Sequence, residues 1–374
     1  MKSKLATIIM TIVILLISAV FILFGVIFYN EFIELSEIVK PEDIKTVISE
    51  NINTIKQEIN VPEIIENPLD KIKDIESQDE NISYSNITIN RYFYNQLEDY
   101  SKIIYNAFEA NKENMKTGTH KIELGDSFSQ LLNEENGQEQ LGKYYQSAIE
   151  AYNYDNPDVF YLSPNKMYLN IETTTKINSV IHKVYISNKQ EEKYLTDEFS
   201  SKEQVNNALK QIEDVKNEIL QNRKSNTYEN IKIVHDYLIE NIEYDTSISK
   251  ENIYNIYGAM VNKQSVCEGY AKSFKYLMDA LAIPCTLVIG EATNSEGQTE
   301  NHAWNYVQVD NNWYAVDCTW DDPISTTGWV SQASKNRYFL KGSEDMLKKH
   351  TPNGQFTEGG KIFNYPELST SNYK

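Results

Sequence analysis

The chain has 374 residues, of which 41% are hydrophobic and 24% charged, an ordinary composition for a folded protein with room for more than one domain. It contains 54 acidic and 35 basic residues, and its formal net charge is -19. Such a surface repels phosphate groups, so nucleic acid is not an expected partner. The three cysteines, Cys267, Cys285 and Cys318, form no disulfide framework or zinc pattern, so at least one should be a free thiol.

The first element in chain order is an apolar run at residues 5–28. It carries no charged residue and is almost entirely Ile, Leu, Val, Phe, Met and Ala. A helix of this length crosses a hydrocarbon core of roughly 30 Å, so the run predicts a transmembrane anchor. Lys2 and Lys4 precede it and acidic residues follow it, which predicts a cytoplasmic tail at residues 1–4 and an extracytoplasmic remainder. A cleaved signal peptide is the alternative, although its apolar region is normally shorter.

Residues 29–89 are expected to form an acidic linker. The stretch from residue 29 to residue 80 holds 14 acidic and 5 basic residues, about half of the net charge. Isoleucines recur at helical spacing within residues 42–60 until Pro62 interrupts the pattern, which favours an amphipathic helix. This helix offers an apolar seam for self-association, and an irregular linker is an equally good interpretation.

Residues 90–195 are predicted to be a small α+β domain without recognisable chemistry. Apolar residues at helical spacing indicate one helix from about Tyr94 and another around Leu141. Two runs rich in β-branched residues, 167–171 and 179–186, indicate strands on either side of a turn-like stretch rich in threonine.

Residues 196–374 contain the candidate chemistry and begin with two predicted helices, at 200–222 and 228–241. His235 lies on the second of these helices. A single histidine on a helix is more often structural than functional, so we do not assign it to the site.

Cys267 is predicted to lie in the first turn of the next helix. Ser265 and Glu268 have the spacing of a capping box, and an apolar face continues until Pro284. The free N–H groups and the dipole at a helix N-terminus favour a thiolate and can bind an oxyanion. A buried, inert cysteine is the alternative, but such a residue does not require a helix start, which favours Cys267 as a nucleophile.

Three strands are expected after this helix, at residues 285–290, 303–309 and 313–318. His302 precedes the second strand and Asp317 is near the end of the third, so an antiparallel hairpin would place them side by side. An imidazole held by a carboxylate is an oriented general base. Cys318 should point to the opposite face of its strand from Asp317, and Cys285 is expected to be buried.

Three motifs in this region resemble the core of the transglutaminase-like superfamily. The resemblance covers roughly residues 228–350, with Cys, His and Asp in the family's order and spacings of 35 and 15 residues. Tyr244-Asp245 upstream and Tyr338-Phe339-Leu340 downstream also match bacterial members of the family. One small departure is Ser265, where the family often has glycine. The motifs read Val-Cys-Glu-Gly-Tyr-Ala at 266–271, His-Ala-Trp-Asn at 302–305 and Trp-Tyr-Ala-Val-Asp-Cys-Thr-Trp-Asp-Asp-Pro at 313–323.

The resemblance implies an α+β, papain-like core in which a nucleophile helix packs on an antiparallel sheet. It implies Cys267 as nucleophile, His302 as base and Asp317 as the orienting acid, with no cofactor. Gln264 could donate to the oxyanion, as glutamine does in papain-like enzymes, or be a polar surface residue. Trp304 and Trp320 would line the acyl groove or fill the core.

The family chemistry implies a thioester formed with a glutamine carboxamide or a peptide carbonyl and resolved by an amine or by water. Because the domain is expected outside the membrane, the expected substrate is a cell-surface protein or a cell-wall peptide. No metal site is expected, since Asp317, Asp321 and Asp322 lack the alternating oxygen ligands and glycine of a calcium loop. A binding or scaffold module on the same fold, without turnover, is the alternative function.

Overall fold

The computed structural model describes residues 91–322, 332–353 and 362–374, except 178 and 190–191. The predicted anchor at 5–28 and the predicted linker helix at 42–60 lie outside these residues. Within the described residues, none of the helices is long and apolar enough to span a membrane.

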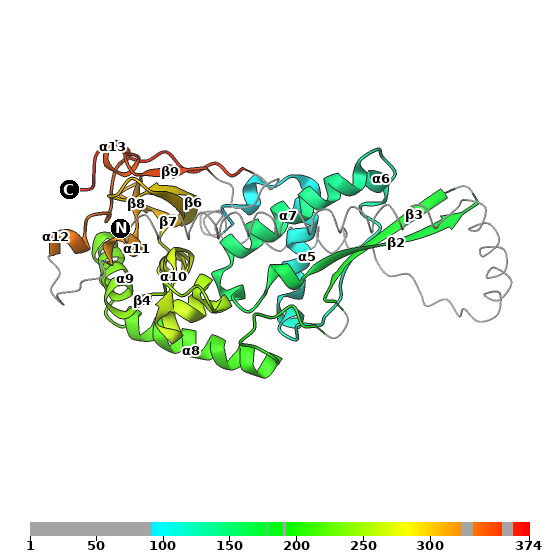
Figure 1. The fold of residues 1–374 in the computed structure, drawn as a ribbon, viewed down its shortest axis with the longest axis horizontal. Coiled ribbons are helices and arrows are strands. Elements are labelled where there is room, and N and C mark those ends of the chain that lie inside the picture. Colours follow the sequence, from blue (N-terminus) through cyan, green and yellow to red (C-terminus); the bar gives the residue numbers. More distant parts are fainter. Residues whose placement is uncertain (1–90, 178, 190–191, 323–331, 354–361) are drawn as a thin grey trace, which may run out of the picture. The chain divides into compact units, whose positions relative to one another are not determined.

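The segment from residue 91 to residue 195 combines helices with a small antiparallel sheet (Figure 1). The sheet has the order β1-β3-β2. One expectation was wrong here: the threonine-rich stretch is not a turn, because Thr173, Thr174 and Thr175 pair with β3 as part of a long ribbon. The main elements are α5 (Asp99–Met115), β1 (Ile122–Gly125), α6 (Ser129–Leu132), α7 (Gly137–Asp155), β2 (Tyr168–Lys176) and β3 (Ser179–Ser187).

Two capped helices follow, close to their predicted positions. α8 spans Lys202–Leu220, and its N-cap Ser201 accepts a hydrogen bond from the backbone N–H of Gln204. α9 spans Thr227–Asn241, and its N-cap Asn226 accepts one from the backbone N–H of Glu229. Each cap satisfies one of the N–H groups that a helix start leaves without an intrahelical partner.

The centre of the fold is α10 (Cys267–Ala280), which packs against strands β6 and β7 and also contacts α9 (Figure 1). The sheet is antiparallel with the order β8-β7-β6-β9. The predicted arrangement of a helix on an antiparallel sheet is therefore present. Its strands are β6 (Cys285–Thr293), β7 (Thr299–Val309), β8 (Asn312–Val316) and β9 (His350–Pro352).

Short elements connect this core. β4 (Glu243–Tyr244) and β5 (Gln264–Ser265) form a two-stranded parallel pair just before α10. Between them lies a π-helical turn, Gly258–Asn262. After β8, the described residues also contain the one-turn helices α11 (Cys318–Asp321), α12 (Gln332–Lys335) and α13 (Ser343–Met346).

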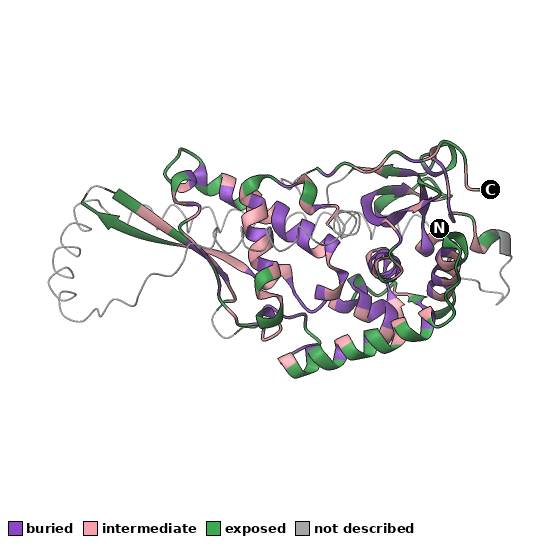
Figure 2. Ribbon diagram, turned by 180° about the vertical axis from the view of Figure 1, so that it is seen from behind, coloured by how far each residue is buried: buried purple, intermediate pink, exposed green. Residues whose placement is uncertain are grey.

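Among the longer helices of the described residues, α10 is the most buried. Figure 2 shows this helix mostly buried, whereas α8 is exposed along one side. Even Lys275 is fully buried on α10, and its ammonium group pairs with Asp279 at 2.7 Å. A rigid α10 fixes the position of the residue at its first turn, Cys267.

One continuous set of buried side chains extends through the described residues on both sides of residue 195. Phe93 packs edge-on against Phe363 at 5.0 Å between ring centroids, and Lys272 donates a hydrogen bond to Asn153 at 2.7 Å. The division into domains at 90–195 and 196–374 remains a prediction from the sequence.

Candidate active site

Cys267 is the first residue of α10 and is partly exposed. The predicted capping box is wrong, although the helix begins where the sequence indicated. The N-cap is Val266, without a side-chain cap. The hydroxyl of Ser265 donates to the backbone carbonyl of Ile253 at 2.9 Å, and Glu268 forms an ion pair with Lys272 at 2.7 Å. The helix start carrying the thiol is therefore held by the preceding loop.

Gly269 allows the close contact between this helix start and that loop. A Cβ atom at this position would lie 2.0 Å from Oγ of Ser265 and 2.8 Å from the carbonyl oxygen of Ile253. Neither contact is compatible with a side chain unless something shifts. The glycine after Cys267-Glu268 is thus required by packing of the turn that holds the thiol.

His302 and Asp317 come from neighbouring elements of the sheet and meet as the hairpin predicted. His302 lies on β7, opposite Gly290 of β6, and Asp317 directly follows β8 as the N-cap of α11. Nε2 of His302 lies 2.8 Å from Oδ2 of Asp317. Oδ1 of Asp317 accepts a hydrogen bond from the backbone N–H of Trp320 at 3.1 Å, which fixes the carboxylate plane.

The electrostatics of this pair favour an imidazolium beside a carboxylate. Burial lowers the pKa of His302, but the charge and hydrogen bond of Asp317, and a hydrogen bond and the charge of Cys267, outweigh burial and raise the pKa above 6.5. Burial raises the pKa of Asp317, but the charges and hydrogen bonds of the imidazoles around it, those of His302 foremost, together outweigh burial and hold the pKa below 3.8. Because Nε2 of His302 faces Asp317, Nδ1 is the ring nitrogen available to the thiol.

A second histidine, His350, contacts the same carboxylate and was not predicted from the sequence. Its Nε2 lies 2.9 Å from Oδ2 of Asp317, and the residue is 1% exposed. It lies 33 residues after Asp317, on a short strand that pairs with β6. No local pattern marks it in the sequence, because its position depends on the pairing of β9.

A separate cluster around His235 supports the segment that carries Asp317. His235 bonds Asp236 through Nδ1 and Asp321 through Nε2, each at 3.0 Å. Asp321 accepts the backbone N–H of Tyr338 at 2.7 Å, and the carbonyl of Tyr338 accepts the backbone N–H of Asp317. His235 therefore links α9 to α11, which agrees with its assignment as a structural residue.

The weaker candidates occupy different surroundings. Gln264 is partly buried on β5, three residues before Cys267, and pairs with Glu243 of β4. Trp304 is 1% exposed and stacks on His302 with 6.0 Å between ring centroids, so it is a core residue and cannot wall an open groove. Trp320 is partly exposed, with its ring 5.3 Å from that of His302.

The two other cysteines are buried and free. Burial raises the pKa of both Cys285 and Cys318. Cys318 is the first residue of α11, so the prediction that it lies on a strand was wrong. The strand ends at Val316 because Asp317 turns the chain into that helix as its N-cap.

Ligand atoms from His302, Asp317 and His350 lie within 4.8 Å of one another, as in some metal sites. These atoms already bond one another at 2.8 and 2.9 Å. A metal ion would have to replace both hydrogen bonds, so we do not assign the three residues as ligands.

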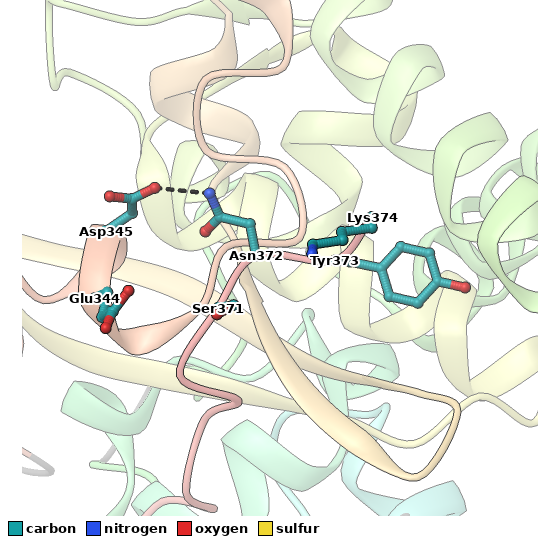
Figure 3. A pocket seen from close by; sticks show the side chains of 6 residues that line it. All are labelled: Glu344, Asp345, Ser371, Asn372, Tyr373 and Lys374. Atoms are coloured by element: carbon teal, nitrogen blue, oxygen red, sulfur yellow. Dashed lines mark hydrogen bonds between the residues drawn. The ribbon is translucent and has the colours of Figure 1, made fainter.

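A pocket elsewhere on the described surface has a different character. It lies between α13 and the C-terminal residues, and Asn372 donates a hydrogen bond to Asp345 across it at 2.7 Å (Figure 3). It shares no residue with the cluster around Cys267. The lining residues are Glu344, Asp345, Ser371, Asn372, Tyr373 and Lys374.

Comparison with known proteins agrees with the motifs. Residues 213–318, which include Cys267, His302 and Asp317, match the sequence profile described as the transglutaminase-like superfamily. The kyphoscoliosis peptidases of Mus musculus and Homo sapiens are 24% and 23% identical over 139 residues, or 34% of this chain. The chain spans 21% of the length of these relatives.

One solved structure, described as the crystal structure of a TGase, is 15% identical. The alignment covers 47% of this chain and 50% of the other, with a TM-score of 0.28. On the profile match and the motifs, residues 213–318 are a domain of the transglutaminase-like superfamily.

Proposed function

We propose that this domain is a thiol acyltransferase or peptidase that forms a thioester on Cys267. One observation carries the proposal: Nε2 of His302 bonds the carboxylate of Asp317, and Cys267 contributes with Asp317 to raising the pKa of His302. This is the arrangement of a nucleophile, a base and an orienting acid. The match to the superfamily supports the same class of chemistry.

The mechanism follows from these positions. The thiol proton passes to Nδ1 of His302, and the thiolate attacks the carbonyl carbon of a carboxamide or peptide. The C–N bond then breaks while Nδ1–H returns the proton to the leaving amine, which leaves a thioester on Cys267. An amine or water attacks the thioester, gives its proton to His302 and releases the acyl group, which restores the thiol.

The oxyanion of each tetrahedral intermediate requires hydrogen-bond donors close to the thiol. The backbone at the start of α10 carries no side-chain cap, and Gln264 precedes it on β5. We assign the amide of Gln264 and the N–H groups of this turn as oxyanion donors. Trp320, whose ring is partly exposed beside His302, is assigned to the wall of the acyl groove.

The nucleophile that attacks the thioester decides which reaction the enzyme catalyses. If a primary amine attacks, the enzyme is a transglutaminase, and if water attacks, it is a peptidase or a deamidase. The same three residues serve each reaction. The two curated relatives are named as peptidases, so hydrolysis is the first reaction to test.

The location follows from the sequence outside the described residues. With residues 5–28 as a transmembrane anchor and residues 1–4 in the cytoplasm, the domain would act on a protein at the cell surface or on a cell-wall peptide. Self-association through the helix at 42–60 would then bring two domains together.

The first test is labelling of the full-length protein by iodoacetamide, read at each cysteine by mass spectrometry. At mildly acidic pH, Cys267 should be labelled faster than the other two cysteines. His302→Ala should slow the labelling of Cys267 until this difference disappears. Cys285 and Cys318 are internal controls because both are buried.

Catalysis itself is tested by incubating the wild-type protein and Cys267→Ala with a glutamine-rich protein, in the presence of a fluorescent primary amine. Incorporation of the amine identifies transfer, and new peptide termini identify proteolysis. If Cys267 reacts no faster than a free thiol and neither product forms, the non-catalytic scaffold is supported instead.

A further inference from the structure

The position of His350 depends on an unusually close approach of two strands. β9 pairs with β6 so that Ala292 lies opposite His350 and Gly290 opposite Pro352. A Cβ atom on Gly290 would lie 2.2 Å from the carbonyl oxygen of Thr351, so only glycine permits this approach without a shift. The strand pairing thus brings a second imidazole to Asp317.

Asp317 accepts three hydrogen bonds. Oδ1 accepts the backbone N–H of Trp320, while Oδ2 is shared by Nε2 of His302 at 2.8 Å and Nε2 of His350 at 2.9 Å. A carboxylate can only accept, so both imidazoles must carry a hydrogen on Nε2. Nδ1 of His350 is buried and has no hydrogen-bond partner, so Nε2 makes the hydrogen bond that holds this ring to the site.

The surroundings of His350 are mostly aromatic. The rings of Trp320, Trp304 and Tyr338 lie 4.6, 5.0 and 5.3 Å from the His350 ring. The charged or titratable groups that face it are Asp317 at the N-cap of α11, His302 on β7 and Tyr338 after α12, with Asp321 one turn along α11 bonded to His235. No described carboxylate other than Asp317 is bonded to His350.

Sharing Oδ2 has a chemical consequence. Each hydrogen bond that a carboxylate accepts makes it a weaker base, and the bond from His350 contributes to lowering the pKa of Asp317. A weaker carboxylate holds the imidazolium of His302 less tightly. His302 must release its proton to a leaving amine, so too strong an ion pair would slow that step.

We propose that His350 is a positioning residue of the site: its Nε2–H donates a second hydrogen bond to Oδ2 of Asp317 and so limits how strongly Asp317 retains the proton on His302. The inference rests on the proposed function, because it assigns His302 as the base for Cys267.

The test follows alkylation of Cys267 by iodoacetate in the full-length protein across pH. This anionic reagent reacts faster with a thiolate beside imidazolium than with an isolated thiolate. The labelling rate should therefore fall at alkaline pH as His302 loses its proton, and we call this fall the alkaline limb. His350→Phe should shift the midpoint of the alkaline limb to higher pH by about half to one pH unit, since one hydrogen bond to the carboxylate is lost. His350→Gln keeps an N–H donor and should return the limb close to that of the wild type.

A matched control is His235→Phe. His235 is a buried histidine bonded to two carboxylates, but it does not touch Asp317. The control should leave the alkaline limb in place, because loss of a structural histidine changes the folded fraction and not the proton affinity of His302. A limb that moves equally in both Phe variants would overturn the inference, as would a limb that His350→Phe leaves unchanged.

A second measurement uses the wild-type protein and does not depend on the folding of a variant. Long-range 15N–1H correlation spectra distinguish the two neutral tautomers of histidine. The inference expects His350 to carry its hydrogen on Nε2, and an Nδ1–H tautomer would contradict it. If the wild-type rate profile has no alkaline limb, the proposed triad itself fails, which separates that result from a failure of His350 alone.

Discussion

Replacing Asp317 with asparagine removes one charge and keeps the shape of the side chain. Asp317 caps α11 through Oδ1 and holds two imidazoles through Oδ2. If the amide oxygen keeps the cap to the N–H of Trp320, the NH2 group faces two N–H donors, from His302 and His350. If the amide flips, the oxygen serves both imidazoles but the cap is lost, at about 1 kcal/mol. The carboxylate charge is absent in both orientations.

The magnitude follows from the burial of the pair. His302 and Asp317 are 3% and 1% exposed, so the imidazolium of His302 would have no buried counter-charge except the thiolate. Removing one partner of a buried ion pair typically costs about 3–5 kcal/mol. At about 1.4 kcal/mol for each factor of ten, the population of the reactive ion pair should fall between roughly 100-fold and several thousand-fold.

The assay is the second-order rate of iodoacetamide labelling of Cys267 near neutral pH, with circular dichroism as a check on folding. Asp321→Asn is the matched control, because Asp321 is a buried carboxylate on the same helix that bonds His235 and the N–H of Tyr338. The control should change the rate by less than about threefold, since it leaves His302 and its partner intact. A folded Asp317→Asn protein that labels within threefold of the wild type would refute the reasoning.

Two further predictions concern stability, measured by urea unfolding. Gly269→Ala should lower the free energy of unfolding by about 1–3 kcal/mol, because its Cβ would lie 2.0 Å from Oγ of Ser265. Gly142→Ala on α7, where a Cβ meets nothing within 4 Å, should be neutral or stabilising by up to about 1 kcal/mol, and a similar loss in both would contradict the packing argument. Burial lowers the pKa of His302, but the charges and hydrogen bonds of Asp317 and Cys267 together more than offset burial, so the raised pKa stabilises the fold fully below about pH 6.5 and progressively less as pH rises. The wild type should therefore lose more unfolding free energy between about pH 6 and about pH 9 than His302→Phe does, and equal losses would show that His302 carries no such linkage.

The sequence by itself predicted the elements around the thiol. Apolar periodicity placed α8, α9 and α10 within a few residues of their ends, because a helix that packs on a core must repeat its apolar face along its own sequence. The hairpin likewise predicted that His302 and Asp317 would meet, since register between strands joined by a short turn is a local property. Cys267 at a helix start also follows from local pattern.

Only the tertiary structure determined those features that depend on contacts between different segments of the chain. The start of α10 is held by a hydrogen bond from the hydroxyl of Ser265 to the carbonyl of Ile253 and not by a capping box, because the packing of the folded chain brings that carbonyl to the hydroxyl. The threonine-rich stretch is a strand because β3 supplies a partner for it.

His350 is the clearest case. A lone histidine on a three-residue strand carries no sequence signal, and it reaches Asp317 only because β9 returns to β6 beside Gly290. That return joins segments far apart in the chain, so only the folded sheet determines which imidazoles share one carboxylate oxygen.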